Sequence, residues 1–122
     1  MKKLLLLNLI LLVMGWCLNA QTATPPASGD GSTSNPYQIA TLENLYWISV
    51  NKGVWDKHFV QTADIDASAT ASWPDGGWKP IGTFELDFSE NPFTGSYDGT
   101  NHSISGLTIN RPNSGSYHNG MF

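Results

Sequence analysis

The stretch FTGSYDGTNHSISGLTIN, from Phe93 to Asn110, decides which fold the sequence predicts. Its first part, FTGSY, has the short alternating pattern of a strand. Asp98 and Gly99 follow as a turn dipeptide of the kind that joins two extended segments. The remainder, HSISGLTIN, is then the returning strand. The stretch therefore predicts strand, turn and strand, and places its glycines in scaffold positions.

The returning strand contains one slip in its alternation. Ile104 points inward, Ser105 and Gly106 add a residue, and Leu107 and Ile109 point inward again. An extra residue with a glycine marks a bulge or corner, where the backbone changes direction and its apolar side chains stay on one interior. Strands that turn corners around one interior predict a solenoid coil rather than a sandwich.

The preceding segments predict one helix followed by strands. Thr41 can cap the N-terminus of a helix that carries Glu43 in its first turn, and Gly53 ends it. Apolar residues at helical spacing give this helix two to three turns, and place it where it can cover one end of the fold. Beyond it, the segment 58–66 alternates as a strand, and 79–84 forms another short strand.

The N-terminus has the layout of a secretory signal peptide. Lys2 and Lys3 precede an apolar run, and Ala20 lies just before a plausible cleavage point. The run is shorter than the ~20 residues of a spanning helix, and Trp16 before Cys17 disfavours lipoprotein processing. We therefore expect export with cleavage after Ala20, a secreted or cell-surface location, and no membrane span in the mature chain.

Composition divides the rest of the chain in two. Residues 21–36 are small, polar and rich in proline and glycine, which predicts a flexible linker. Residues 37–122 then form the domain. The formal net charge is −4, and loss of Lys2 and Lys3 with the signal peptide makes the mature chain more acidic still, which disfavours nucleic-acid binding. No cysteine remains after cleavage, so disulfides and thiolate chemistry are not expected.

Asp64 and Asp66 are the weak candidates for chemistry. They lie two positions apart on one predicted strand, so both carboxylates point the same way and can bind calcium or act as an acid–base pair. The alternative is a solvated strand face or acceptance of backbone N–H bonds in a turn, which we favour because no acidic cluster accompanies them. His58, His102 and His118 lack metal-ligand spacing, and no cofactor is expected.

Aromatic residues offer a second candidate site. Exposed rings in loops can stack on sugars, and the mature chain is rich in them, including Trp55, Trp73, Trp78 and Tyr97. The alternative is that Trp73 and Trp78 fold over the interior as core, since large aromatics dominate burial. We favour this packing role.

Four blocks in a fixed order resemble a known family. GSTSNPYQIATLENLYWIS, KHFVQTADIDAS, GWKPIG and FTGSYDGTNHSISGLTINRP are together similar to the N-terminal module of bacterial GLUG-repeat proteins, which are large secreted or surface proteins. Gly120, Met121 and Phe122 match the first three positions of the repeat motif, with Met in place of Leu. The resemblance implies a right-handed parallel β-helix with a short N-terminal capping helix, incomplete at its C-terminus.

The resemblance also implies an adhesin-like function without chemistry. It defines no catalytic residues, so the first hypothesis is a non-catalytic N-terminal segment of an exported repeat protein. Its expected partners are glycans, surface proteins, or the following repeats of its own full-length chain. One alternative is a fragment of a β-helical polysaccharide lyase or glycosidase that uses Asp64, Asp66 and Lys79. Another is a spacer for a downstream domain.

Overall fold

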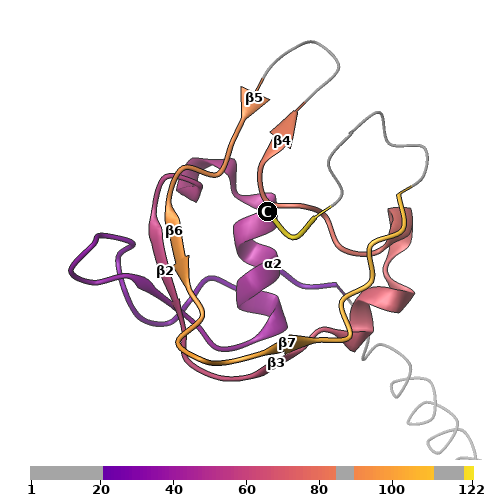
Figure 1. Ribbon diagram of the computed structural model, residues 1–122, viewed down its shortest axis with the longest axis horizontal. Helices are drawn as coiled ribbons and strands as arrows, with labels where there is room; N and C mark the ends of the chain where they lie inside the picture. Colours follow the sequence, from indigo (N-terminus) through magenta and orange to yellow (C-terminus); the bar gives the residue numbers. More distant parts are fainter. Residues whose placement is uncertain (1–20, 85–89, 112–119) are drawn as a thin grey trace, which may run out of the picture.

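The computed structural model describes residues 21–84, 90–111 and 120–122, and for Thr83 and Phe84 the backbone only. One α-helix and three small sheets make up this part of the chain (Figure 1). The elements, in chain order, are β1 (Tyr37–Ile39), α2 (Leu42–Val50), β2 (His58–Gln61), β3 (Ile65–Asp66), β4 (Thr83–Phe84), β5 (Glu90–Asn91), β6 (Ser96–Asp98) and β7 (Ile104–Ser105). Short 3-10 helices lie at Lys52–Val54, Ser68–Ser72 and Pro74–Gly76.

The predicted helix is confirmed as α2, but it ends at Val50, and Gly53, predicted to end it, lies in the 3-10 helix that follows. The Thr41 side chain accepts a hydrogen bond from the Asn44 backbone N–H at 3.1 Å, and Glu43 lies in the first turn beside the positive end of the helix dipole. Leu45 and Ile48 are fully buried, as expected for residues three apart on one face. Among the described residues, no helix is long and apolar enough to cross a bilayer.

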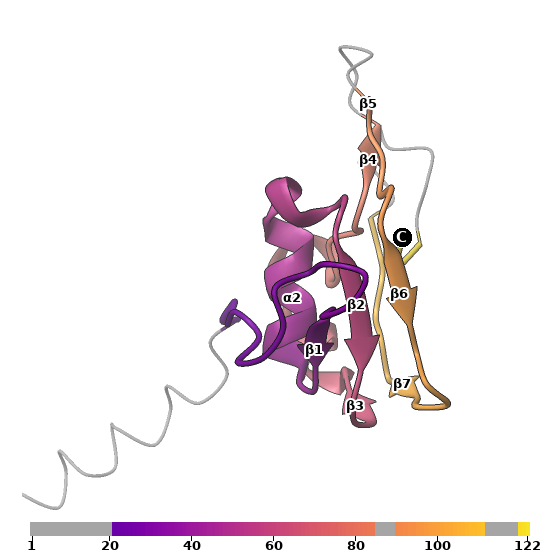
Figure 2. The ribbon, with the colours of Figure 1, turned by 90° about the vertical axis from the view of Figure 1, so that its left-hand side faces the viewer.

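Five of the seven described strands form two parallel sheets. In the first, the order is β1-β2-β6, and Phe59 of β2 lies between Tyr37 of β1 and Tyr97 of β6. In the second, β3 pairs with β7, which places Ile65 beside Ile104. Figure 2 shows the resulting layers, with α2 first, then β1 and β2, and then β6 and β7. The segment with β6 and β7 therefore runs over the segment with β2 and β3 in the same direction.

The predicted right-handed parallel β-helix is wrong. The part of the molecule outside the two parallel sheets, which we call its third side, contains strands that pair in the antiparallel sense. There, β4 and β5 are antiparallel, and Gly77 and Ile109 form an antiparallel bridge. Two hydrogen bonds fix this bridge, from Trp78 N–H to Thr108 O at 2.8 Å and from Asn110 N–H to Gly76 O at 2.7 Å. A solenoid coil needs the same chain direction on every side, and the described residues form only small parallel and antiparallel sheets.

The core lies between α2 and the two parallel sheets. Trp78 and Phe59 are the largest side chains in it, and both are almost completely inaccessible. Trp55 is also buried, and its indole N–H donates to the carbonyl of Ile48 at 2.7 Å, so its polar atom is satisfied. The other buried hydrophobic members are Ile39, Leu45, Ile48, Ile65 and Ile81.

Residues 21–36, predicted from composition to be a flexible linker, are hydrogen-bonded to the domain. Thr24 N–H donates to the carbonyl of Glu43 in α2 at 3.1 Å. Ser28 O accepts from Gln38 N–H of β1, and Gly31 O accepts from His58 N–H of β2, both at 3.0 Å. This segment therefore covers the outer edge of β1, so the sheet is closed on that side.

Candidate functional site

The opposite side of the molecule presents two open strand edges. Ser96 N–H donates to Lys57 O at 3.1 Å, so Ser96 faces β2. Successive residues of a parallel strand direct their backbone groups alternately to the two sides, so the N–H and C=O of Tyr97 point away from β2. On either side of Ile104, the carbonyls of Ser103 and Ser105 accept from the N–H groups of Ile65 and Ala67, so the backbone N–H and C=O of Ile104 likewise point away from β3. No hydrogen bond from another described segment reaches these outward groups.

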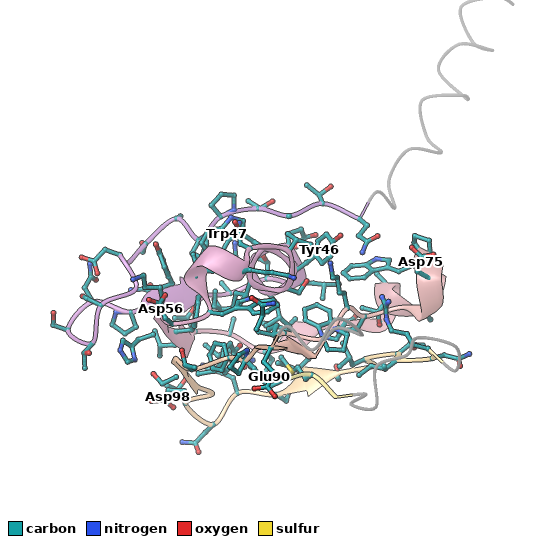
Figure 3. The ribbon with its side chains drawn as sticks, turned by 90° about the horizontal axis from the view of Figure 1, so that it is seen from above. Tyr46, Trp47, Asp56, Asp75, Glu90 and Asp98 are labelled. Atoms are coloured by element: carbon teal, nitrogen blue, oxygen red, sulfur yellow. The ribbon has the colours of Figure 1, made fainter. Side chains whose placement is uncertain are left out.

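Partly covered apolar side chains lie beside these edges. Phe122 is 48% exposed, and its ring centroid lies 5.1 Å from that of Phe93 and 5.5 Å from that of Tyr97. We use the name open face for Phe93, Tyr97, Ile104, Leu107, Ile109, Met121 and Phe122, of which all but Phe122 pack against the core while remaining partly accessible. Figure 3 shows Tyr46 and Trp47 at the helix side of the molecule and Asp98 on the opposite side.

Gly95 allows β6 to approach β2 closely. Its N–H and that of Thr94 both donate to Trp55 O at 2.9 Å. A Cβ atom at Gly95 would lie 1.9 Å from Lys57 O, far inside van der Waals contact. Sequence reasoning passed over this glycine, although a glycine within a strand signals close approach of another backbone.

Gln61 joins the two layers through a buried polar network. Its side chain is 2% exposed, and its amide donates to the carbonyls of Ala63 and Ser103, both at 2.9 Å. Its amide oxygen accepts from the Tyr97 hydroxyl at 3.0 Å, and the Thr100 hydroxyl donates to its backbone carbonyl. Burial raises the pKa of Tyr97 above its ordinary value, so the phenol stays protonated and remains a donor. Sequence reasoning missed this role, although the alternation of 58–66 put a polar residue on the inward face.

Asp64 and Asp66 both accept hydrogen bonds from backbone amides. Asp64 Oδ1 accepts from Ser103 N–H at 2.9 Å and contacts His102 Nδ1 at 3.2 Å. Asp66 Oδ1 accepts from Ser68 N–H at 2.9 Å. Among the described residues, no group of three or more His, Cys, Asp or Glu side chains is placed to hold a metal ion. The geometry matches the structural role that the sequence favoured for this pair.

The hydrogen bonds to Asp64 make a pH-dependent contribution to stability. The N–H of Ser103, and then the side chain of His102, lower the pKa of Asp64 below 3.8. A carboxyl with a lowered folded-state pKa stabilises the fold above its unfolded pKa, and this contribution is lost as pH falls through the folded pKa. We expect Asp64→Asn to reduce the free energy of unfolding slightly at about pH 7, and the deficit to shrink below about pH 3.8.

Chemical denaturation at several pH values measures this effect. Asp56→Asn is the charge-matched control, because the ion pair of Asp56 within the described residues is with Lys57, at 3.4 Å, and both side chains are well exposed. An Asp64→Asn deficit that stays constant from neutral to acidic pH would refute the assigned role of the ionised carboxylate.

The turn after β6 lies slightly later than the predicted dipeptide. Thr100 and Asn101 have positive φ values of 47° and 64°, so they occupy the centre of the turn. Asp98 and Gly99 lie just before it, where the Asp98 carboxylate accepts from Thr100 N–H at 2.9 Å and Gly99 O accepts from His102 N–H at 2.8 Å. The turn leads from one parallel sheet into the other, so the predicted return strand is not the hairpin partner of β6.

The chain bends again directly after β7. Ser105 is the last residue of that strand, and Gly106 has a φ of 71°. A Cβ atom at Gly106 would lie 3.1 Å from Ser68, so this bend also brings two backbone segments close together.

The segment matching the repeat motif pairs with the domain. Met121 O accepts from Ile81 N–H at 2.9 Å, and from the indole of Trp78 at 3.5 Å. Gly120 is half-buried, and Phe122 belongs to the open face. These contacts place the motif beside the third side of the molecule.

The aromatic candidates divide between core and surface. Trp55 and Trp78 are buried, so neither can stack on a ligand in this structure. Trp73 is half-buried between Tyr46, at a ring separation of 4.9 Å, and Trp78, at 6.1 Å. Tyr97 belongs to the open face. For Trp73 and Trp78, the structure favours the packing role over the sugar platform.

Within the described residues, the remaining candidates are not assembled into a catalytic arrangement. His58 lies between the hydroxyls of Ser96, at 2.7 Å, and Thr33, at 3.2 Å. A hydrolytic triad would need a carboxylate at the second imidazole nitrogen instead of a hydroxyl. Lys79 is exposed, and His118 lies outside the described residues.

Two curated proteins share this segment. Halomucin from Haloquadratum walsbyi is 42% identical over 87 residues, which cover 69% of this chain and 1% of that protein. A putative Gly-rich membrane protein from Evansella cellulosilytica is 35% identical over 85 residues, which cover 70% of this chain and 9% of that protein. The chain thus spans only a small part of the length of these relatives, and neither relative has the name of an enzyme. No family model and no solved structure matches the chain.

Proposed function

We propose that this chain is a non-catalytic assembly segment of an exported cell-surface or secreted protein, and that it binds other polypeptide through the edges of β6 and β7 and the open face. The asymmetry of the fold carries this proposal. The outer edge of β1 is covered by residues 28–31, whereas the outward backbone groups of Tyr97 and Ile104 meet no described segment. Exposed strand edges are normally blunted, and an open edge beside apolar side chains favours strand addition.

The comparisons and the N-terminal sequence support the cellular setting. Halomucin and the Gly-rich membrane protein carry the related segment within much longer chains. The N-terminal basic and apolar residues fit a signal peptide cleaved after Ala20. Membership of the GLUG-repeat group is part of the same proposal, and it rests on the four sequence blocks rather than on the fold.

Polypeptide is a better partner than glycan for this face. Strand addition uses backbone hydrogen bonds, and the outward groups of Tyr97 and Ile104 offer them. Glycan binding would need accessible aromatic faces, and two of the tryptophans considered for it, Trp55 and Trp78, are buried. Following repeats of the same full-length chain, or a neighbouring surface protein, are the partners that this proposal assigns.

Self-association of the exported chain tests the proposal. With its open face uncovered, the chain recovered after export should associate in a concentration-dependent way, measured by sedimentation velocity. Phe122→Lys should weaken this association by about tenfold or more, because it places a charge in the apolar contact.

Val50→Lys is the matched control. Val50 and Phe122 are the two large hydrophobic side chains that stand exposed in the described part of the chain, at 41% and 48%, and Val50 lies on α2. The control should associate like the parent chain. A parent that stays monomeric at all concentrations, or equal weakening by both variants, would refute the proposed surface.

A further inference from the structure

The first parallel sheet carries a column of aromatic side chains in register. Tyr37 of β1 pairs with Phe59 of β2, and Phe59 pairs with Tyr97 of β6. The rings of Tyr37 and Phe59 stack at 5.7 Å with an interplanar angle of 29°. Each strand of the sheet therefore contributes one aromatic residue at the same level, and Tyr97 ends the column.

The second parallel sheet carries an aliphatic column. Ile65 of β3 pairs with Ile104 of β7, and these side chains face the same core as the aromatic column. In the chain, Ile65 follows Phe59 by six positions, and Ile104 follows Tyr97 by seven. The spacing reflects the turn that carries the chain from one sheet to the other.

We propose, on the basis of the proposed function, that the open edge selects a partner segment with this same pattern. The segment adds parallel to β6 and β7, with an aromatic residue opposite Tyr97 and a β-branched aliphatic residue opposite Ile104, six or seven positions later. Its backbone bonds to the outward groups of Tyr97 and Ile104. Its aromatic ring extends the column and contacts Phe122, which already lies 5.5 Å from Tyr97.

The register of the partner determines whether it fits. Side chains alternate between the two faces of a strand, so a slip of one residue turns the whole apolar set to solvent. A polar side chain would then face Tyr97 and Phe122 without a hydrogen-bonding partner, which is unfavourable. The parallel direction follows the two pairings that the described strands already make, of β2 with β6 and of β3 with β7.

Peptide addition to the exported chain tests this pattern. The matching probe is TGSYDGTNHSISG, which copies residues 94–106 and carries Tyr and Ile seven positions apart. The control, TGSDYGTNHSSIG, has the same composition but exchanges Tyr with Asp and Ile with Ser, so both apolar residues shift by one position. Unlabelled peptide is added to isotope-labelled protein below its self-association concentration, and amide hydrogen exchange is followed by NMR.

The matching peptide should slow exchange at the Tyr97 and Ile104 amides by about tenfold, because new backbone bonds protect them. The control peptide should leave both rates unchanged. Equal slowing by the two peptides would overturn the pattern and leave the open edge as a general strand acceptor. If neither peptide binds while Phe122→Lys still weakens self-association, the pattern is again wrong and the proposed function survives. If neither peptide binds and the parent chain is monomeric, both fail.

Discussion

Replacing Trp78 with alanine is expected to lower the free energy of unfolding by about 3–5 kcal/mol. The Trp78 side chain is fully buried and is the largest such side chain in the core. Its ring stacks on Trp73, and its indole N–H reaches Met121 O at 3.5 Å. The substitution opens a cavity between α2 and the strands and removes both contacts. Because domains of this size are stable by about 5–15 kcal/mol in total, much of the variant should be unfolded.

Urea denaturation followed by circular dichroism measures the loss, with Trp47→Ala as control. Trp47 lies on α2 and is only partly buried, with its ring in edge contact with Tyr37 at 5.5 Å. The same truncation there should cost clearly less, about 1–2 kcal/mol, because it exposes less apolar surface and leaves no enclosed cavity. Equal losses for the two variants would show that Trp78 is not the centre of the core.

Gly95→Ala is expected to cost about 2–4 kcal/mol through a different mechanism. The added methyl group would meet the Lys57 carbonyl oxygen at 1.9 Å, and the other nearest atoms are also backbone atoms of Lys57. Backbone cannot move aside as a flexible side chain can, so β6 must separate from β2. The paired hydrogen bonds from Thr94 and Gly95 to Trp55 O should weaken together.

Gly53→Ala is the matched control for this variant. A Cβ atom at Gly53 would meet nothing within 4 Å, and its φ lies outside the left-handed range. The substitution should be neutral or slightly stabilising, since alanine reduces the entropy of the unfolded chain. Thermal unfolding of both variants distinguishes a steric clash at the β2–β6 contact from a general intolerance of added methyl groups.

Local sequence signals predicted the elements better than their arrangement. The helix followed from the capping position of Thr41 and from Leu42, Leu45 and Tyr46 at helical spacing, because such signals act within one or two turns. Alternation marked one strand at 58–66, which the structure divides into β2 and β3 in two different sheets. Alternation carries no information on strand direction, however, so it could not show that Gly77 and Ile109 pair in the antiparallel sense. That pairing is why a solenoid was the wrong inference.

Composition alone also did not show that residues 21–36 are hydrogen-bonded to the domain. Small polar residues cannot bury much apolar surface, but they can be held by backbone hydrogen bonds to a neighbouring strand. Gly31 is buried here, and an added Cβ would lie 2.4 Å from the Tyr37 ring, so its small size is what permits the contact. The strand to which such a segment binds is decided by tertiary structure, which the pattern of one sequence does not contain.

The candidate site could be predicted only in part. The sequence pointed to Asp64 and Asp66 because two carboxylates on one strand face can bind calcium or act as an acid–base pair. The donor that engages Asp64, the N–H of Ser103, lies 39 positions away and is brought near only by the pairing of β3 with β7. The open edge itself has no local signal, because an unpaired strand edge is defined by what does not lie beside it. From the sequence, Tyr97 was recognised as a strand residue and a candidate aromatic, and Ile104 as an inward strand position, but neither was assigned to an unpaired edge.

The most direct test of the open edge is amide hydrogen exchange at two neighbouring residues of β6. Ser96 N–H donates to Lys57 O, whereas Tyr97 N–H points away from β2, so the two amides should differ although they are adjacent in the chain. Measured by NMR in dilute solution and corrected for intrinsic rates, Tyr97 should exchange at least about tenfold faster than Ser96. Equal protection of the two amides, or slower exchange at Tyr97, would contradict the open edge on which the proposed function rests.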